Sequence, residues 1–312
     1  MDAHEKDVVL CPGQGAQVVG MGRDLFESFA EGRRVFEDAN DVLGFDLAAK
    51  CFDGPEEELN RTDVSQPAIF TTGVACFHAA VKAGVIDPDE VATYAGLSLG
   101  EYTALHLAGV FTFDDGLRLV RRRGELMQQA ASATASGMVT LLGADEAAVE
   151  KLCAEQAQGE VLVAANYNCP GQIVASGSMA ACERLTAAAT EAGFRAIPLK
   201  VAGAFHSPLM QPAADAMAAE LDKVEFREPG RPVWSNVTAR PHAGADEIRR
   251  LLVEQIVKPV RWQQTTQRLV EFSPRRFVEL APGRVLAGLL KKVDRKQPVE
   301  SLQSAESLIV AG

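Results

Sequence analysis

The chain has 312 residues, of which 47% are hydrophobic and 23% charged. This is the composition of a globular protein, and it excludes disordered, coiled-coil and collagen-like chains. The formal net charge of −11 argues against a nucleic-acid binder and against a protein that adheres to anionic membranes.

The cysteines and the apolar segments indicate the compartment. The six cysteines form no CxxC pair and, with five scattered histidines, no zinc-site spacing. We therefore expect buried free thiols and no bound metal. The acidic N-terminal stretch leads directly into an apolar strand, and polar residues interrupt the longest apolar run, residues 68–85. The sequence predicts a cytoplasmic protein with neither a targeting peptide nor a membrane span.

Short apolar segments alternate with longer amphipathic ones, which predicts an α/β fold with a largely parallel sheet. The predicted strands of this sheet are residues 8–10, 91–96, 232–236 and 276–280. Between 135 and 200 the order becomes β-α-β-β-α-β, which is typical of a ferredoxin-like unit. We predict that residues 1–134 and 201–312 form the core, that 135–200 form an inserted small domain, and that the chain from Lys296 onward is loose.

The first predicted strand ends in a glycine-containing loop, residues 11–17. Its Gly13-x-Gly15 spacing suggests a dinucleotide site, but Val18 stands where that motif needs Gly or Ala. The alternative is a loop that brings its backbone and Gln14 close to an active site, where an N–H group would complete an oxyanion hole.

Residues 96–100 read Gly-Leu-Ser-Leu-Gly and lie between a predicted strand and a predicted helix. This is the G-x-S-x-G nucleophile motif in its required context. The glycines avoid steric clashes in a sharp turn, and the helix N-terminus offers N–H groups to an oxyanion. We therefore interpret Ser98 as a nucleophile, against the alternative of an ordinary glycine-rich turn.

Arg123 lies on the apolar stripe of a helix predicted over residues 113–130. A buried arginine must pair with an anion, because an unpaired buried charge costs several kcal/mol. Two explanations remain open here. One is a salt bridge to a buried acidic residue, and the other is a carboxylate that arrives with the substrate.

His206 is the one histidine in a segment shaped for exposure, residues 202–208. A serine nucleophile needs a base within hydrogen-bond reach, so His206 is the candidate. No acidic residue stands where a hydrolase would carry its third catalytic group. We therefore expect a backbone or amide carbonyl to orient the imidazole.

Eight segments together resemble the malonyl-CoA:acyl carrier protein transacylases of fatty acid synthesis. They are residues 12–17, 96–102, 123–127, 166–172, 204–208, 235–237, 255–262 and 279–283. The resemblance covers residues 8 to about 292 and implies a hydrolase-like α/β core with a ferredoxin-like insertion. Leu97 departs from the commoner pattern, in which a histidine precedes the serine.

The resemblance also implies the roles of the site residues. Ser98 would be the acylated nucleophile and His206 its base, while Gln255 would orient the imidazole through its main-chain carbonyl. Arg123 would hold the malonyl carboxylate.

Three further residues receive roles from the same resemblance. Gln14 and Leu99 would offer N–H groups to the oxyanion, and Phe205 would leave little room for an α-methyl branch.

The implied activity is ping-pong transfer of malonyl from malonyl-CoA to the phosphopantetheine thiol of acyl carrier protein, by a monomer without metal or cofactor. The rival functions are a serine esterase or thioesterase, a non-catalytic docking module, and a transferase that serves polyketide carriers.

Residues 249–296 carry twelve basic and four acidic side chains, a local charge of +8 within an acidic chain. We expect part of this surface to attract the acidic carrier protein.

Overall fold

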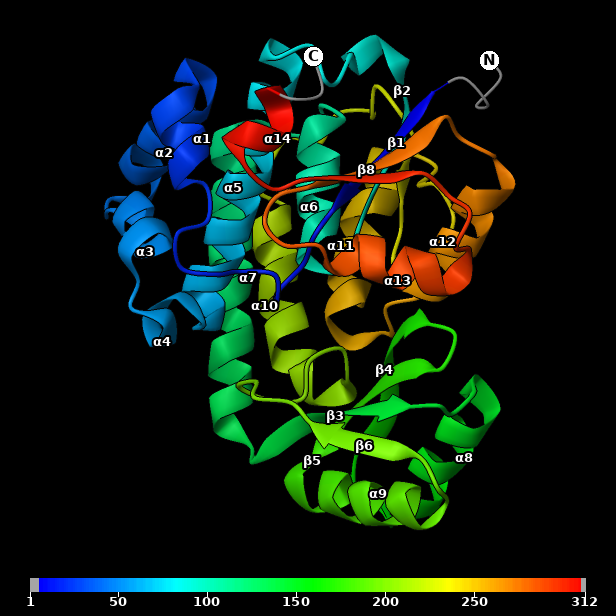
Figure 1. Cartoon of the computed structure of the whole chain (residues 1–312). Coiled ribbons are helices and arrows are strands. Elements are labelled where there is room, and N and C mark those ends of the chain that lie inside the picture. The colour runs from blue at the N-terminus through cyan, green and yellow to red at the C-terminus, as the bar shows by residue number, and fades with distance from the viewer. Residues whose placement is uncertain (1–5, 310–312) are drawn as a thin grey trace.

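The computed structural model describes residues 6–309. A five-stranded parallel sheet and a four-stranded antiparallel sheet lie in two separate parts of the molecule (Figure 1). The predicted α/β class is therefore confirmed. The first five residues, which belong to the stretch where we expect no targeting peptide, lie outside the described part of the chain.

The larger sheet has the strand order β7-β2-β1-β8-β9, and all neighbouring strands are parallel. Its strands are β1 (Asp7–Cys11), β2 (Val91–Gly96), β7 (Val233–Trp234), β8 (Arg276–Leu280) and β9 (Val299–Leu302). Cys11 pairs with Gly96 at the carboxyl ends of β1 and β2. The loop after β1 and the turn after β2 therefore lie side by side.

Helices cover both faces of this sheet, which is why β1 is buried along its whole length. The helices of this part of the chain are α1 (Arg23–Ser28), α2 (Ala30–Leu43), α3 (Leu47–Asp53), α4 (Glu56–Leu59), α5 (Thr62–Lys82), α6 (Leu99–Leu107), α7 (Phe113–Ala133), α10 (Gln211–Leu221), α11 (Ala245–Val257), α12 (Trp262–Glu271), α13 (Val285–Val293) and α14 (Ala305–Ile309), with short 3₁₀ turns η2 (Pro88–Glu90) and η3 (Pro208–Met210). Val9 packs in the cluster that contains α2, α5 and α7, whereas Val8 and Leu10 pack with Trp262 and α13. Successive strand residues thus serve opposite faces.

The smaller sheet has the order β4-β5-β3-β6. Its elements are β3 (Ser136–Leu142), α8 (Glu146–Ala157), β4 (Leu162–Cys169), β5 (Gln172–Ser178), α9 (Met179–Glu191) and β6 (Arg195–Pro198). Val139 and Ile173 pack in a cluster with α8 and α9, while Met138 and Val174 belong to the core cluster. One face of the sheet therefore carries its helices, and the other faces the larger domain. We propose that residues 135–200 are an inserted domain with these boundaries.

Backbone hydrogen bonds hold the small sheet against the core. Tyr167 N donates to Val260 O at 2.9 Å, and Val260 N donates to Ala165 O at 2.8 Å. Val260 lies in the short segment between α11 and α12, so these hydrogen bonds connect β4 to the segment that follows α11. The groups contributed by the two sheets are thereby fixed relative to one another.

The C-terminal segment differs from its prediction. Instead of being loose from Lys296, the chain forms β9, which pairs in parallel with β8, and then α14. Leu302 and Leu308 are buried. The segment lacks a continuous apolar run because only Leu302 of this short edge strand is buried, and β9 includes the polar residues Glu300 and Ser301.

The cysteines match their prediction, since all six are buried and free. Burial raises the pKa of the Cys51, Cys76 and Cys153 thiols to about 12. These thiols are therefore protonated and unreactive near neutral pH.

Within residues 6–309, every helix is too short or too polar to cross a membrane.

Candidate active site

Ser98 occupies the tight turn between β2 and α6. Its backbone has φ 52° and ψ −105°, in the positive-φ region that side chains other than glycine rarely adopt. A Cβ atom on Gly96 would lie 2.0 Å from the Gly100 carbonyl oxygen, and one on Gly100 would lie 2.0 Å from the Cys11 carbonyl oxygen. The two flanking glycines are therefore required for the turn that presents the serine.

The hydroxyl of Ser98 meets the imidazole of His206. Ser98 Oγ lies 2.8 Å from His206 Nε2, and His206 Nδ1 lies 2.7 Å from the carbonyl oxygen of Gln255. Because a carbonyl only accepts, Nδ1 carries the proton and Nε2 is free to accept from the serine. Burial, together with the charge of Arg123, lowers the pKa of His206 to about 4 despite the Gln255 carbonyl. The imidazole is therefore neutral near pH 7 and able to act as a base.

The Gln255 carbonyl is available because of its position in α11. Gln255 lies in the last turn of this helix, where carbonyls lack a partner four residues ahead. That partner would be Pro259, which has no N–H group. The proline is a sequence signal for the free carbonyl. The helix C-terminus also favours the positive charge that His206 acquires when it takes a proton.

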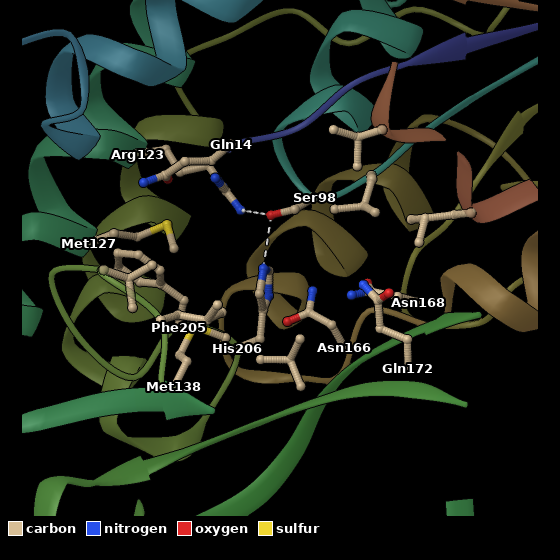
Figure 2. A pocket seen from close by; sticks show the side chains of 16 residues that line it. Gln14, Ser98, Arg123, Met127, Met138, Asn166, Asn168, Gln172, Phe205 and His206 are labelled. Atoms are coloured by element: carbon tan, nitrogen blue, oxygen red, sulfur yellow. Dashed lines mark hydrogen bonds between the residues drawn. The ribbon is translucent and has the colours of Figure 1, made fainter. Parts of the chain in front are cut away.

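Arg123 projects from α7 to the same point (Figure 2). Its Nη2 donates to Ser98 Oγ at 3.1 Å and to Gln255 Oε1 at 2.9 Å, and its Nη1 donates to Gln66 Oε1 at 2.8 Å. The residue is 1% exposed, and within residues 6–309 no carboxylate lies within salt-bridge distance of it. Of the two explanations that the sequence left open, a direct salt bridge is absent from this part of the chain.

Two backbone N–H groups are free near the serine. Leu99 is the first residue of α6, so its N–H has no partner within the helix. Neither this N–H nor that of Gln14 donates to an acceptor in residues 6–309. Gln14 lines the cavity beside Ser98. The close approach of its loop depends on Gly13, where a Cβ atom would lie 2.2 Å from the Leu97 carbonyl oxygen.

A cavity of about 190 Å³ opens between the core and the small sheet, next to Ser98. Its lining residues are Gln14, Leu97, Ser98, Arg123, Met127, Met138, Asn166, Asn168, Gln172, Val174, Leu199, Val201, Phe205, His206, Val285 and Leu289. Figure 2 shows Met127, Met138 and Phe205 gathered on one side of His206, and Asn168 and Gln172 on the other. The cavity thus has an apolar side and an amide-rich side, with the serine between them. Leu97, which precedes the serine, contributes an apolar wall.

Asn236, Glu101 and His242 form a buried polar network behind Ser98. The sequence by itself assigned no role to these three residues. Asn236 Oδ1 accepts from the Ser98 N–H at 2.5 Å, and Asn236 Nδ2 donates to Gly96 O at 2.7 Å. Glu101 accepts from the Asn236 N–H at 3.0 Å and lies 2.8 Å from His242 Nε2. The network fixes both ends of the turn. Asn236 and Glu101 lie in two of the eight segments that carry the family resemblance, but their partners are more than a hundred residues away in the sequence.

Gln66 was also missed. It lies next to Pro67 in the largely apolar helix α5, and its side chain is buried. A buried amide in an apolar helix needs a hydrogen-bond partner, and here that partner is Arg123.

Among residues 6–309 no group of three or more His, Cys, Asp or Glu side chains has the geometry of a metal site.

The chain was compared with known families and structures. Residues 8–310 match the acyl transferase domain model. The chain is 39% identical over 308 residues to the malonyl CoA-acyl carrier protein transacylase of Bacillus subtilis, covering 98% of this chain and 96% of that protein.

Solved structures of similar proteins agree with these sequence matches. The malonyl CoA-acyl carrier protein transacylase of Coxiella burnetii superposes with a TM-score of 0.95 at 35% identity, covering 100% of this chain and 98% of that chain. A malonyl-transacylase in complex with its type II polyketide acyl-carrier protein gives 0.94 at 40% identity, with coverage of 98% and 99%. The nucleophile turn, the imidazole beside it and these matches lead to one conclusion: the chain belongs to the acyl transferase domain family and, within it, is similar to the malonyl CoA-acyl carrier protein transacylases.

Proposed function

We propose that this protein transfers a malonyl group from malonyl-CoA to the phosphopantetheine thiol of acyl carrier protein. The observation that carries the proposal is Arg123, a buried cation whose Nη2 lies 3.1 Å from the nucleophilic oxygen and whose hydrogen-bond partners are all neutral. A buried guanidinium without a carboxylate partner favours a substrate that brings its own carboxylate. Malonyl-CoA carries that carboxylate close to its thioester, as the position of Arg123 requires.

In the first half-reaction, His206 Nε2 takes the proton of Ser98 Oγ, which attacks the thioester carbonyl. The N–H groups of Gln14 and Leu99 stabilise the resulting oxyanion. When the tetrahedral intermediate collapses, the C–S bond breaks and His206 returns the proton to the departing sulfur. Free CoA and a malonyl ester on Ser98 result.

The second half-reaction runs the same steps in reverse. His206 takes the proton of the phosphopantetheine thiol, whose sulfur attacks the malonyl ester. The ester bond breaks, and Ser98 recovers its proton from His206. Throughout, Gln255 holds the imidazole in the tautomer that leaves Nε2 free. We assign Phe205 to acyl selection, because its ring lines the apolar side of the cavity.

The basic C-terminal surface divides into paired and unpaired cations. Arg275 and Arg276 bind the buried carboxylate of Asp7, so they stabilise the fold. Lys291 and Lys292, in contrast, are exposed on α13 and make no salt bridge within residues 6–309. The same helix lines the catalytic cavity through Val285 and Leu289. We propose that this face of α13 attracts the acidic carrier protein.

The reaction is proposed to take place in the cytoplasm, because six buried free thiols suit a reducing compartment. The carrier is proposed to belong to fatty acid synthesis. A polyketide carrier is the alternative, since one similar structure is a complex with such a protein.

Intact-mass measurement after mixing with malonyl-CoA tests the function. We expect a malonyl adduct that is absent from Ser98→Ala and that is discharged by a carrier protein bearing phosphopantetheine. An adduct that water discharges equally fast without the carrier would instead identify a thioesterase. Folded protein that forms no adduct would exclude acyl transfer. Parallel discharge by fatty-acid and polyketide carriers would distinguish the two partners.

A further inference from the structure

The positive charge of Arg123 is buried, and the groups in direct contact with its guanidinium are neutral. Its hydrogen-bond partners are the side chains of Gln66, Ser98 and Gln255, and its Nε has no partner at all within residues 6–309. Its Cζ also lies 5.5 Å from the centre of the Tyr102 ring. None of these groups carries a full negative charge at neutral pH. An uncompensated buried cation would cost several kcal/mol.

A buried carboxylate lies one side chain further away. Glu101 is 0% exposed, and its Oε2 accepts from Gln255 Nε2 at 2.7 Å. The other end of the same amide, Gln255 Oε1, accepts from Arg123 Nη2 at 2.9 Å. The Gln255 amide therefore lies between the anion and the cation, with its positive end on Glu101 and its negative end on Arg123. The carboxylate fixes this orientation, because it can only accept.

Glu101 is held in place from the other side. Its Oε1 lies 2.8 Å from His242 Nε2, and its Oε2 also accepts from the Asn236 N–H at 3.0 Å. His242 Nδ1 has no partner within residues 6–309. Both oxygens of Glu101 are thus occupied by groups of the core, and neither faces the cavity.

We propose that Glu101 is the counter-ion of Arg123, connected through the Gln255 amide, and that it balances the charge of the malonyl-binding guanidinium without occupying the donors that the substrate needs. Burial lowers the pKa of Arg123, and the neighbouring Tyr102 and Glu101 oppose that effect, which agrees with such a role. The arrangement has a functional advantage over a direct salt bridge. A carboxylate placed directly on Arg123 would occupy the donors that the substrate needs, whereas Glu101 balances the charge from a distance.

The proposal deepens the proposed function, but its first test needs no substrate. Glu101→Gln preserves the shape and the acceptor toward Asn236 while it removes the charge. Arg123→Met removes the cation and nearly preserves volume. We expect each single variant to leave one buried charge unbalanced, so the double variant should be destabilised less than the sum of the two. Denaturant unfolding should reveal a coupling of about 10- to 100-fold in the unfolding equilibrium constant.

Glu279 provides the matched control. It is equally buried, but it binds the N–H groups of Leu286 and Ala287 at the start of α13 and has no link to Arg123. Glu279→Gln should therefore be additive with Arg123→Met. Additive effects for Glu101→Gln as well would overturn the proposal. If Glu101→Gln alone does not fold, recovery of folding in the double variant supports the proposal, and continued failure to fold contradicts it.

A binding measurement separates charge balance from simple structural support. In a Ser98→Ala background, which prevents chemistry, Glu101→Gln should bind malonyl-CoA about three- to tenfold more tightly, because the substrate carboxylate no longer competes with Glu101 for the same cation. Binding of acetyl-CoA should stay the same. Weaker malonyl-CoA binding would show that Glu101 only holds the geometry. If Ser98→Ala with native Glu101 does not prefer malonyl-CoA over acetyl-CoA, the proposed function fails, while the unfolding cycle still decides the counter-ion.

Discussion

Replacing Arg123 by methionine tests the central assignment. The guanidinium is 1% exposed and donates to Ser98 Oγ at 3.1 Å, so a malonyl carboxylate bound to it is removed from water. Leaving one member of a buried ion pair without its partner costs about 3–5 kcal/mol. At about 1.4 kcal/mol per tenfold, the rate of malonyl-enzyme formation per unit of malonyl-CoA should fall about 10²- to 10⁴-fold. Acetyl-CoA has no such carboxylate, so its slow reaction should lose much less rate than the reaction of malonyl-CoA.

The assay is rapid-quench measurement of acyl-enzyme formation with each thioester, read as intact mass. Arg122→Met is a matched control on the same helix, because Arg122 binds Glu125 and Glu220 and is 39% exposed. This control should leave both rates unchanged. Equal losses with malonyl-CoA and acetyl-CoA in Arg123→Met would refute the carboxylate assignment and leave Arg123 a structural role.

The remaining predictions concern the base, the turn, the acyl pocket and the carrier. His206 must be neutral to act as a base, and burial lowers its pKa to about 4. The rate of acylation should therefore stay constant from pH 8 to 6 and fall by half near pH 4. A rate profile with its midpoint near pH 6.5 would contradict this prediction. Gly100→Ala should abolish acylation and lower the melting temperature, because the new Cβ atom would lie 2.0 Å from the Cys11 carbonyl oxygen. A folded and active variant would show that the turn tolerates a side chain at this position. Phe205→Ala should raise methylmalonyl transfer relative to malonyl transfer in a competition assay, and an unchanged ratio would remove Phe205 from acyl selection. Charge reversal at Lys291 and Lys292 should slow transfer to the carrier at low salt without slowing acylation, whereas an unchanged rate and salt dependence would exclude these two lysines.

Local features were predictable from the sequence because the physics behind them is local. The turn at Ser98 depends on Gly96, where a Cβ atom would clash with the carbonyl of Gly100 four residues later, and the helix after the turn provides the Leu99 N–H. The alternation of apolar segments likewise predicted the parallel sheet and the small antiparallel unit. The residues alone made His206 the candidate base, and the family resemblance then supplied roles for Arg123 and Gln255. The structure brings these three residues together around the Ser98 oxygen and its network.

Only the tertiary structure decided how the buried charges are arranged. Every residue has a main-chain carbonyl, so residue type alone does not identify Gln255 as the partner of His206, 49 positions away. Arg123 and Gln255 are separated by 132 positions, and Glu101 and His242 by 141. Whether a buried arginine meets an acid or an amide depends on which distant helix packs against it. The sequence by itself determined the glycine-flanked turn at Ser98 and placed a cation, Arg123, on the apolar face of a helix. The packing of α6, α7 and α11 determined that amide groups, not a carboxylate, contact this cation.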